Sequence, residues 1–436
     1  MIEWQIFIVC AVLLMLGLFA TGMPIFLAFL TLNLAGLYVL SGSFKGVLLI
    51  INSMYDTSTS MSLAAIPLFI LLGEILFRSS AVNVVFNAVD GVVGAVRARL
   101  YIVSVVLSTV FGALSGSAMA VAAMMGSSLL PEMWKRGYDR RLSMGTILGG
   151  SSLAPIIPPS VMAVVLGILA GVSISSLLVA GIVPGLILGV VFFAYVVLRV
   201  KLNPSLAPPS TTDTHLPASV RLGLVLKALP FVLIIVAIMG LIIAGVATPT
   251  EAAAVGCIVA LIICGLFATL DTGKLLEALR ATARTTSMIM IIMVCSVSFS
   301  QILNMSGVTT SLVQAVVTLD WSPVLMFVLL MGLGFVLCMF IDQIAVMILL
   351  VPLYKSIIAG LGFDPLWFWA IFLINVSVGN ITPPFGYTLF TLQGVARGVP
   401  IQELYRAALP FIVLYAVMIA VFALLPGLIT YLPSLM

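Results

Sequence analysis

Long apolar runs alternate with short polar or basic stretches along the whole chain, and this pattern predicts membrane-spanning helices. In the first part of the chain we predict spans at residues 3–20, 23–40, 64–77 and 175–198. In the second part we predict spans at residues 228–246, 251–270, 286–304 and 405–430. Polar positions interrupt residues 82–99, which favours an interfacial helix, and residues 308–320 form a second weak segment.

Two other apolar segments, residues 142–172 and 366–396, cannot be continuous helices, because each contains a proline pair. Pro158–Pro159 interrupt the first segment and Pro383–Pro384 interrupt the second, 225 residues later. Unwound backbone at membrane depth is tolerated only where it faces protein or a water-filled cavity. Two broken helices at matching positions in two halves predict an ion or substrate site.

Two further apolar runs, residues 100–133 and 322–354, have polar centres. The first centre reads Leu-Ser-Gly-Ser-Ala at 114–118, and the second reads Phe-Ile-Asp-Gln at 340–343. Basic residues flank the first run at both ends, which favours a re-entrant helical hairpin with both ends on one side of the membrane. Ser117 and Asp342 are equivalent positions, because they are separated by the same 225 residues as the proline pairs.

A polar, proline-rich linker at residues 203–219 divides the chain into two repeats, residues 1–202 and 220–436. With the N-terminus outside and five crossings plus one hairpin in each half, the second repeat is inverted and both termini are periplasmic. All of the 18 Lys and Arg residues except Lys45 and Lys355 then face the cytoplasm. The positive-inside rule therefore supports this topology.

Composition agrees with these elements: 63% of the residues are hydrophobic and 7% are charged. We therefore predict an all-α polytopic protein of the lipid bilayer. No basic stretch carries interleaved aromatic residues, so nucleic acid is not an expected partner, and no Walker A motif is present. An enzyme is not expected, because an intramembrane protease needs a His or a second acid at depth. The sole histidine, His215, lies in the linker, and Asp342 has no acidic partner.

The two hairpin tips and two helix breaks are predicted to converge near the membrane midplane. Their hydroxyl, amide and carbonyl oxygens are hard ligands that suit sodium. The candidates are Ser115, Gly116, Ser117, Ser151, Ser152, Ser160, Asp342, Gln343, Asn375, Ser377, Asn380, Thr382 and Thr388. Asp342 is the only acid predicted deep in the membrane. An anionic substrate would be held by the free amides of helix N-termini, and a bound cation would strengthen that site.

Five stretches together resemble the large membrane subunit of tripartite ATP-independent periplasmic (TRAP) transporters. They read IPLFILLGEIL (66–76), FGALSGSAMAVAAMMGS (111–127), GGSSLAPIIPPS (149–160), GVATPTEAAAVG (245–256) and NVSVGNITPPFGY (375–387). The resemblance implies an inverted-repeat elevator transporter of the bacterial inner membrane, coupled to sodium ions. It also implies a small four-span membrane subunit and a periplasmic substrate-binding protein as partners.

The resemblance further implies that each hairpin tip pairs with the break in its own half. Carried over to this chain, one sodium site comprises Ser115, Gly116, Ser117, Ser151 and Ser152. The other comprises Asp342, Gln343, Gly379, Asn380 and Thr382. We assign the substrate side to Ser117, Ala118, Ser160, Asn375 and Thr388.

Two other transport classes remain open at this stage. A stand-alone sodium-coupled dicarboxylate symporter would share the architecture, although residues 245–256 favour the tripartite class. A channel would share the composition, although paired broken helices fit alternating access better. The expected substrate is a small organic acid anion, with C4-dicarboxylates, sugar acids and sulfonates all suited to this chemistry.

Overall fold

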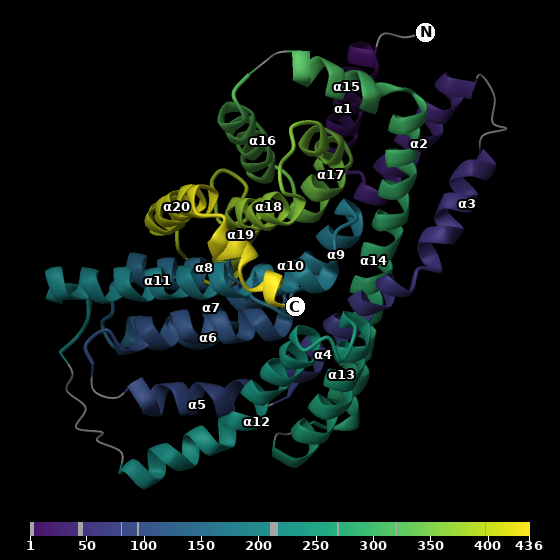
Figure 1. The fold of residues 1–436 in the computed structure, drawn as a ribbon. Helices are drawn as coiled ribbons and strands as arrows, with labels where there is room; N and C mark the ends of the chain where they lie inside the picture. Colours follow the sequence, from purple (N-terminus) through teal and green to yellow (C-terminus); the bar gives the residue numbers. More distant parts are fainter. Residues whose placement is uncertain are drawn as a thin grey trace.

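The structure is a computed structural model that describes residues 4–41, 47–79, 81–93, 96–209, 217–267, 270–318, 321–396 and 398–436. Lys45, His215 and Arg397, which entered the sequence analysis, lie outside these ranges. Every regular element within them is a helix (Figure 1). Seven of the described helices are long and apolar enough to cross a membrane. The all-α fold with two hairpins and two broken helices is therefore confirmed.

The N-terminal helices follow the predicted spans with one addition. Their bounds are α1 Trp4–Ala20, α2 Ile25–Ser41, α3 Val47–Ser58, the short 3₁₀ helix η2 Met61–Ala64 and α4 Ala65–Arg78. The apolar pattern did not predict α3, because half of it overlaps a Ser- and Thr-rich stretch. In the structure α3 packs against the long helix α14 (Thr272–Met305) (Figure 1).

The first hairpin begins after α5 (Ala81–Val93) and consists of α6 (Arg99–Ser115) and α7 (Ala118–Lys135). Gly116 separates the two helices at a φ of +62°, a left-handed conformation that glycine adopts without a Cβ penalty. At the other end, the Arg99 guanidinium donates to both carboxylate oxygens of Asp90 at 2.7 Å, which fixes α5 to the base of the hairpin.

The first broken helix and the predicted span after it make four helical segments. They are α8 Arg140–Ser151, α9 Val161–Ala170, α10 Ile174–Ala180 and α11 Ile182–Leu202. The span is thus divided at Gly181. A Cβ on Gly181 would lie 2.3 Å from the Ile156 carbonyl oxygen, so this glycine lets the chain approach the unwound segment closely. Beyond α11, the Tyr101 hydroxyl donates to the Leu206 carbonyl at 2.6 Å and ties the start of the linker to α6.

The second half repeats this order. Its helices are α12 Ala218–Ile243, α13 Pro249–Phe267, α14, α15 Val308–Thr318, α16 Pro323–Cys338, α17 Gln343–Gly360, α18 Pro365–Gly379, α19 Tyr387–Val395, α20 Ile401–Leu424 and α21 Gly427–Thr430. Helices α17 and α18 begin 225 residues after α7 and α8. Helix α14 starts well before the predicted span at 286, because Asp271 caps it and good helix formers such as Leu275, Glu277 and Ala278 follow.

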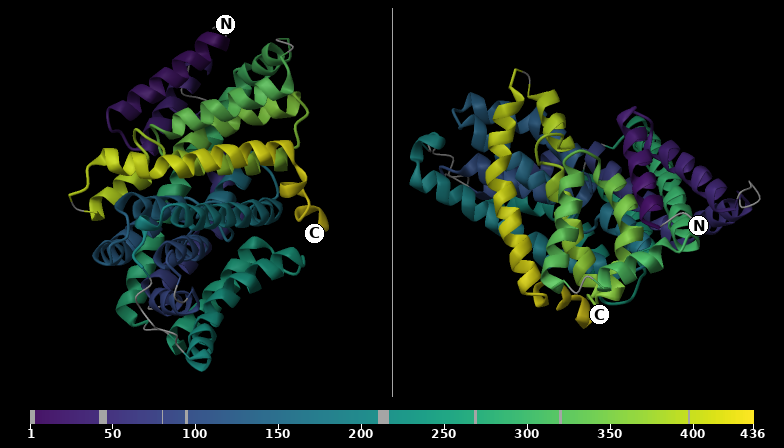
Figure 2. Two further views of the ribbon diagram at one scale, coloured as in Figure 1. Left: turned by 90° about the vertical axis from the view of Figure 1, so that its left-hand side faces the viewer. Right: turned by 90° about the horizontal axis from the view of Figure 1, so that it is seen from above.

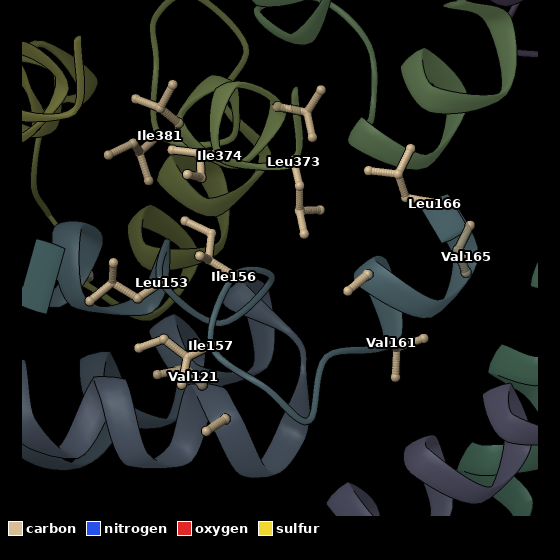
Figure 3. Packing of buried hydrophobic residues seen from close by; sticks show 14 of the residues in the cluster. Val121, Leu153, Ile156, Ile157, Val161, Val165, Leu166, Leu373, Ile374 and Ile381 are labelled. Atoms are coloured by element: carbon tan, nitrogen blue, oxygen red, sulfur yellow. The ribbon is translucent and has the colours of Figure 1, made fainter. Parts of the chain in front are cut away.

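The two halves share one core around the breaks. Figure 3 shows Leu153, Ile156 and Ile157 of the first unwound segment beside Leu373 and Ile374 of α18. All five side chains are buried. The final long helix, α20, lies along α8 and α11 of the first half (Figure 2). Helices of the second half therefore cover the unwound backbone of the first half.

The contact between α20 and α8 depends on a glycine, which has no side chain to separate the two helices. A Cβ on Gly149 would lie 2.2 Å from Cδ1 of Phe411, and the Phe411 ring is held edge-on by Phe192 and Tyr195 at 5.2 and 5.4 Å between centroids. Phe411 is fully buried and cannot move away.

We expect Gly149→Ala to lower the thermal stability of the purified protein, since overpacking a rigid core costs about 1–3 kcal/mol. The control is Gly240→Ala on α12, where an added Cβ meets nothing within 4 Å and helix propensity favours Ala by about 1 kcal/mol. Thermal unfolding of both variants in detergent is the measurement. Equal melting temperatures for the two variants would contradict the close contact.

Candidate functional site

The first hairpin tip lies directly on the first helix break. A Cβ on Gly112 would lie 2.9 Å from Cα of Ala154, and one on Gly116 would lie 3.3 Å from the Val161 nitrogen. The tip therefore touches both the start of the unwound segment and the start of α9. This contact brings the predicted residues Ser115 and Ser117 to the break that follows Ser151.

The hydroxyl protons at the first break are donated to nearby carbonyls. Ser151 donates to Leu148 at 3.0 Å, Ser152 to Gly149 at 2.7 Å, and Ser160 to Pro155 at 2.5 Å. Because Ser152 is the donor to Gly149, the Tyr415 hydroxyl, 2.9 Å away, donates to Ser152.

Tyr415 belongs to the second half and was not among the predicted residues. It occupies an apolar span with no neighbouring polar residue, so the sequence pattern carries no signal for its role. Its hydroxyl nevertheless holds the first break against α20.

Two serines at the first site start helices, and a third, Ser115, ends α6. Ser117 accepts the Ala120 amide of α7 and Ser160 accepts the Ala163 amide of α9. Ser115 accepts the Ser117 amide at 3.3 Å. The oxygens of Ser117 and Ser160 are therefore placed by helix caps, and Ala118 follows as the first residue of α7.

The second hairpin tip is joined to the second break more directly. The Asn380 amide nitrogen donates to Oε1 of Gln343 at 2.7 Å, and the Phe385 amide donates to the Met339 carbonyl at 3.1 Å. A Cβ on Gly379 would lie 2.2 Å from Cβ of Cys338, so only glycine allows α18 to end this close to α16. The structure thus brings Gln343, Gly379 and Asn380 together.

Two buried oxygens at this break have no hydrogen-bond partner in the described part of the chain: Oδ1 of Asn380 and Oγ1 of Thr388. Their residues are 3% and 0% exposed, and the Thr388 amide donates to the Asn380 carbonyl at 3.1 Å. An unpaired buried oxygen is costly unless a ligand or ion satisfies it. Of the unpaired buried atoms among the described residues, these two lie next to a predicted helix break.

Asp342 lies at the second tip, where its carboxylate accepts the Ile344 amide at 2.9 Å and caps α17. Thr382 donates its hydroxyl proton to the Val378 carbonyl at 2.7 Å, within the last turn of α18. The oxygen atoms of both side chains therefore sit at the junction between tip and break. Both residues were predicted from the sequence.

Asn375 and Ser377 make different contacts. The Asn375 amide donates to the Met331 carbonyl at 2.8 Å and links α18 to α16. Asn375 also lines an apolar groove of about 300 Å³ between α16, α18 and α20. Ser377 donates to the Leu373 carbonyl within its own helix. The structure thus shows helix-packing contacts for these two side chains, while Asn380 and Thr388 flank the second break.

Comparison with known proteins agrees with this architecture. The family model for the DctM component of tripartite ATP-independent periplasmic transporters matches residues 12–428, and the chain belongs to this family. It is 29% identical to the ectoine TRAP transporter large permease protein TeaC of Halomonas elongata, over 97% of both chains. It is 31% identical to the C4-dicarboxylate TRAP transporter large permease protein DctM of Pseudomonas aeruginosa, over 87% of this chain and 88% of that one.

The fold also has a solved counterpart. The YdaH transporter of Alcanivorax borkumensis superimposes with a TM-score of 0.66 at 14% identity, over 92% of this chain and 97% of that chain. At this identity the likeness concerns the fold alone. The chain is thus a large permease subunit of the TRAP class, a polytopic membrane transporter.

The unpaired Thr388 hydroxyl leads to a prediction about the stability of the protein. We expect Thr388→Val, in buffer without small cations, to raise the melting temperature, because it removes an unsatisfied buried group worth about 1–3 kcal/mol. The control is Thr391→Val on the same helix, whose hydroxyl donates to the Tyr387 carbonyl and whose replacement should change little. A large loss of stability in Thr388→Val would show that its hydroxyl is bonded.

Proposed function

We propose that this chain is the membrane-embedded pathway of a sodium-coupled importer of a small organic acid. Its partners are a small four-span membrane subunit and a periplasmic substrate-binding protein, in the bacterial inner membrane. The observation that carries the proposal is the pair of unpartnered oxygens on Asn380 and Thr388, in a chain that belongs to the TRAP permease family.

The residues at both sites fit a hard monovalent cation. Asp342 supplies a carboxylate and Asn380 supplies a free carbonyl oxygen at the second site, beside Gln343. The first site would use the oxygens of Ser115, Ser117, Ser151 and Ser152 together with carbonyls at Gly116. Bound sodium would supply positive charge close to an anionic substrate.

Helix N-termini are the groups of this chain that we expect to hold the substrate carboxylate. Helices α7, α9, α17 and α19 all begin at a tip or a break. Gly386, which precedes α19, offers no side-chain cap, and the first amides of α19 donate instead to backbone carbonyls, Thr388 to Asn380 and Leu389 to Gly386. An anion at this helix end would compete only with backbone carbonyls for these amides. Anion and cation sites would then adjoin, which couples their occupancy.

The substrate class follows from this chemistry more than from the relatives. The relatives are named for ectoine, C4-dicarboxylates and, in Vibrio cholerae, sialic acid, at 29%, 31% and 27% identity. We therefore propose a small organic acid with a carboxylate or sulfonate group.

We further propose that the tips and breaks move together against a scaffold. The scaffold would comprise α2, α4, α12, α13 and α14, each of which packs against at least one other member of the group. The repeated order of elements supports inverted repeats at residues 1–202 and 220–436. The distribution of basic residues supports periplasmic termini.

Uptake of radiolabelled organic acids into proteoliposomes tests the proposal. The vesicles would contain this chain and its membrane partner, with each candidate binding protein, and with or without an inward sodium gradient. We expect uptake to need both sodium and a binding protein. Sodium-driven uptake without a binding protein would instead identify a stand-alone symporter, and proton-driven uptake indifferent to sodium would contradict the ion sites.

In the same assay, Asp342→Asn and Asn380→Ala should each raise the sodium concentration for half-maximal uptake by about tenfold or more, since a charged or buried contact is lost. The control for Asp342 is Asp364→Asn, because Asp364 caps α18 in the same way through the Trp367 amide. An equal effect of both Asp variants would assign Asp342 to helix capping alone.

A further inference from the structure

A polar cleft of about 660 Å³ lies away from the tips and breaks. Its walls are η2 and the start of α13 on one side, and the end of α9 with the start of α10 on the other. Six hydroxyl-bearing residues line it: Ser60, Ser62, Ser173, Ser175, Thr248 and Thr250. Organic anions are hydrogen-bond acceptors, so a cleft rich in hydroxyl donors suits them.

One charged side chain lines this cleft and a second lies beside one of its lining residues. Glu251 lines it, with one carboxylate oxygen accepting the Thr248 amide and hydroxyl at 2.8 Å. The Lys355 ammonium packs on Gly171, another lining residue, where an added Cβ would lie 2.7 Å from Nζ. None of the ion pairs found among the described residues involves Lys355. The cleft therefore has the exposed ammonium of Lys355 at one rim and the carboxylate of Glu251, which accepts the Thr248 amide, on the opposite wall.

Two helices connect the cleft with the candidate site. Lys355 lies on α17, 12 residues beyond the tip at Gln343, or about 18 Å along the helix. Gly167 of the cleft lies on α9, which begins at the first break. Helices α9 and α17 pack on each other; α9 runs from the first break and α17 from the second tip toward the cleft.

We propose that this cleft is an outer vestibule that captures the carboxylate of the substrate, with the Lys355 ammonium as its anchor. The inference rests on the proposed function and on the topology that places residues 60–62, 248–251 and 355 outside. The Lys355 charge attracts the anion and the Glu251 charge repels it. The two residues should therefore have opposite effects on anion capture.

Thiol labelling measures the charge in the cleft without transport. Ser175→Cys would be introduced into a Cys10→Ala background, because Cys10 is exposed. The full complex would be labelled from outside with anionic 2-sulfonatoethyl and cationic 2-trimethylammonioethyl methanethiosulfonate. We expect Lys355→Gln to lower the ratio of anionic to cationic labelling rates about two- to fivefold, the range of one exposed charge. Glu251→Gln, which keeps an oxygen for Thr248, should raise that ratio.

Lys135→Gln at the end of α7 is the matched control and should leave the ratio unchanged. If Lys355→Gln leaves the ratio of anionic to cationic labelling rates unchanged, the vestibule is overturned. Labelling of Ser175→Cys only after the membrane is permeabilised would also overturn it. Because labelling needs no uptake, these outcomes are distinguishable from a failure of the proposed function.

Uptake kinetics provide the second measurement. Lys355→Gln should raise KM for uptake about two- to fivefold without lowering kcat, and Glu251→Gln should lower KM. The transported acid should also protect Ser175→Cys from labelling when no binding protein is present. An unchanged KM, an increase in both variants, or an effect on KM without protection by the free acid would each overturn the assignment of Lys355 to the substrate.

Discussion

Unwound backbone inside a membrane protein is the constraint on which this structure depends. Residues 152–160 and 380–386 interrupt their helices at depth, where every unpaired amide and carbonyl costs free energy. The second break is satisfied partly by the hairpin, since the Phe385 amide donates to the Met339 carbonyl, and partly by itself, since Gly386 donates to Thr382. The missing side chain of Gly379 allows this approach, because any Cβ would meet Cys338. The hairpins are thus needed as covers for the breaks.

The two halves share an architecture but differ in chemistry. At the first break the hydroxyl groups of Ser151, Ser152 and Ser160 all donate to nearby carbonyls. At the second break the side chains include a carboxylate and two amides, and the oxygens of Asn380 and Thr388 have no hydrogen-bond partner among the residues that the structure describes. Equivalent positions therefore offer different groups, and the carboxylate among the predicted ligands lies at the second site. Tyr415 links the two by donating to Ser152 from α20, the last long helix of the second half.

The sequence predicts where the helices of this fold are interrupted better than it predicts how long they are. Proline pairs and small polar centres identify both breaks and both hairpins, because their effect on the backbone is local. Helix α14 is longer than predicted, since its charged first turns dilute the apolar signal although they form a good helix.

Side-chain partners across helices are harder to predict, because they depend on packing between distant segments. Asn375 lies one turn before Asn380 and has the same chemistry, yet it binds Met331 of α16. The cleft at Lys355 likewise joins four distant segments that no local pattern connects.

Hydrogen–deuterium exchange tests the central claim most directly. Peptides that cover residues 152–160 and 380–386 would be followed in sodium and in potassium at equal ionic strength, with α12 as an internal reference. The account predicts that sodium slows exchange in both breaks and leaves α12 unchanged, because the ion would hold the tips against the breaks. Equal exchange in both salts at both breaks would contradict it.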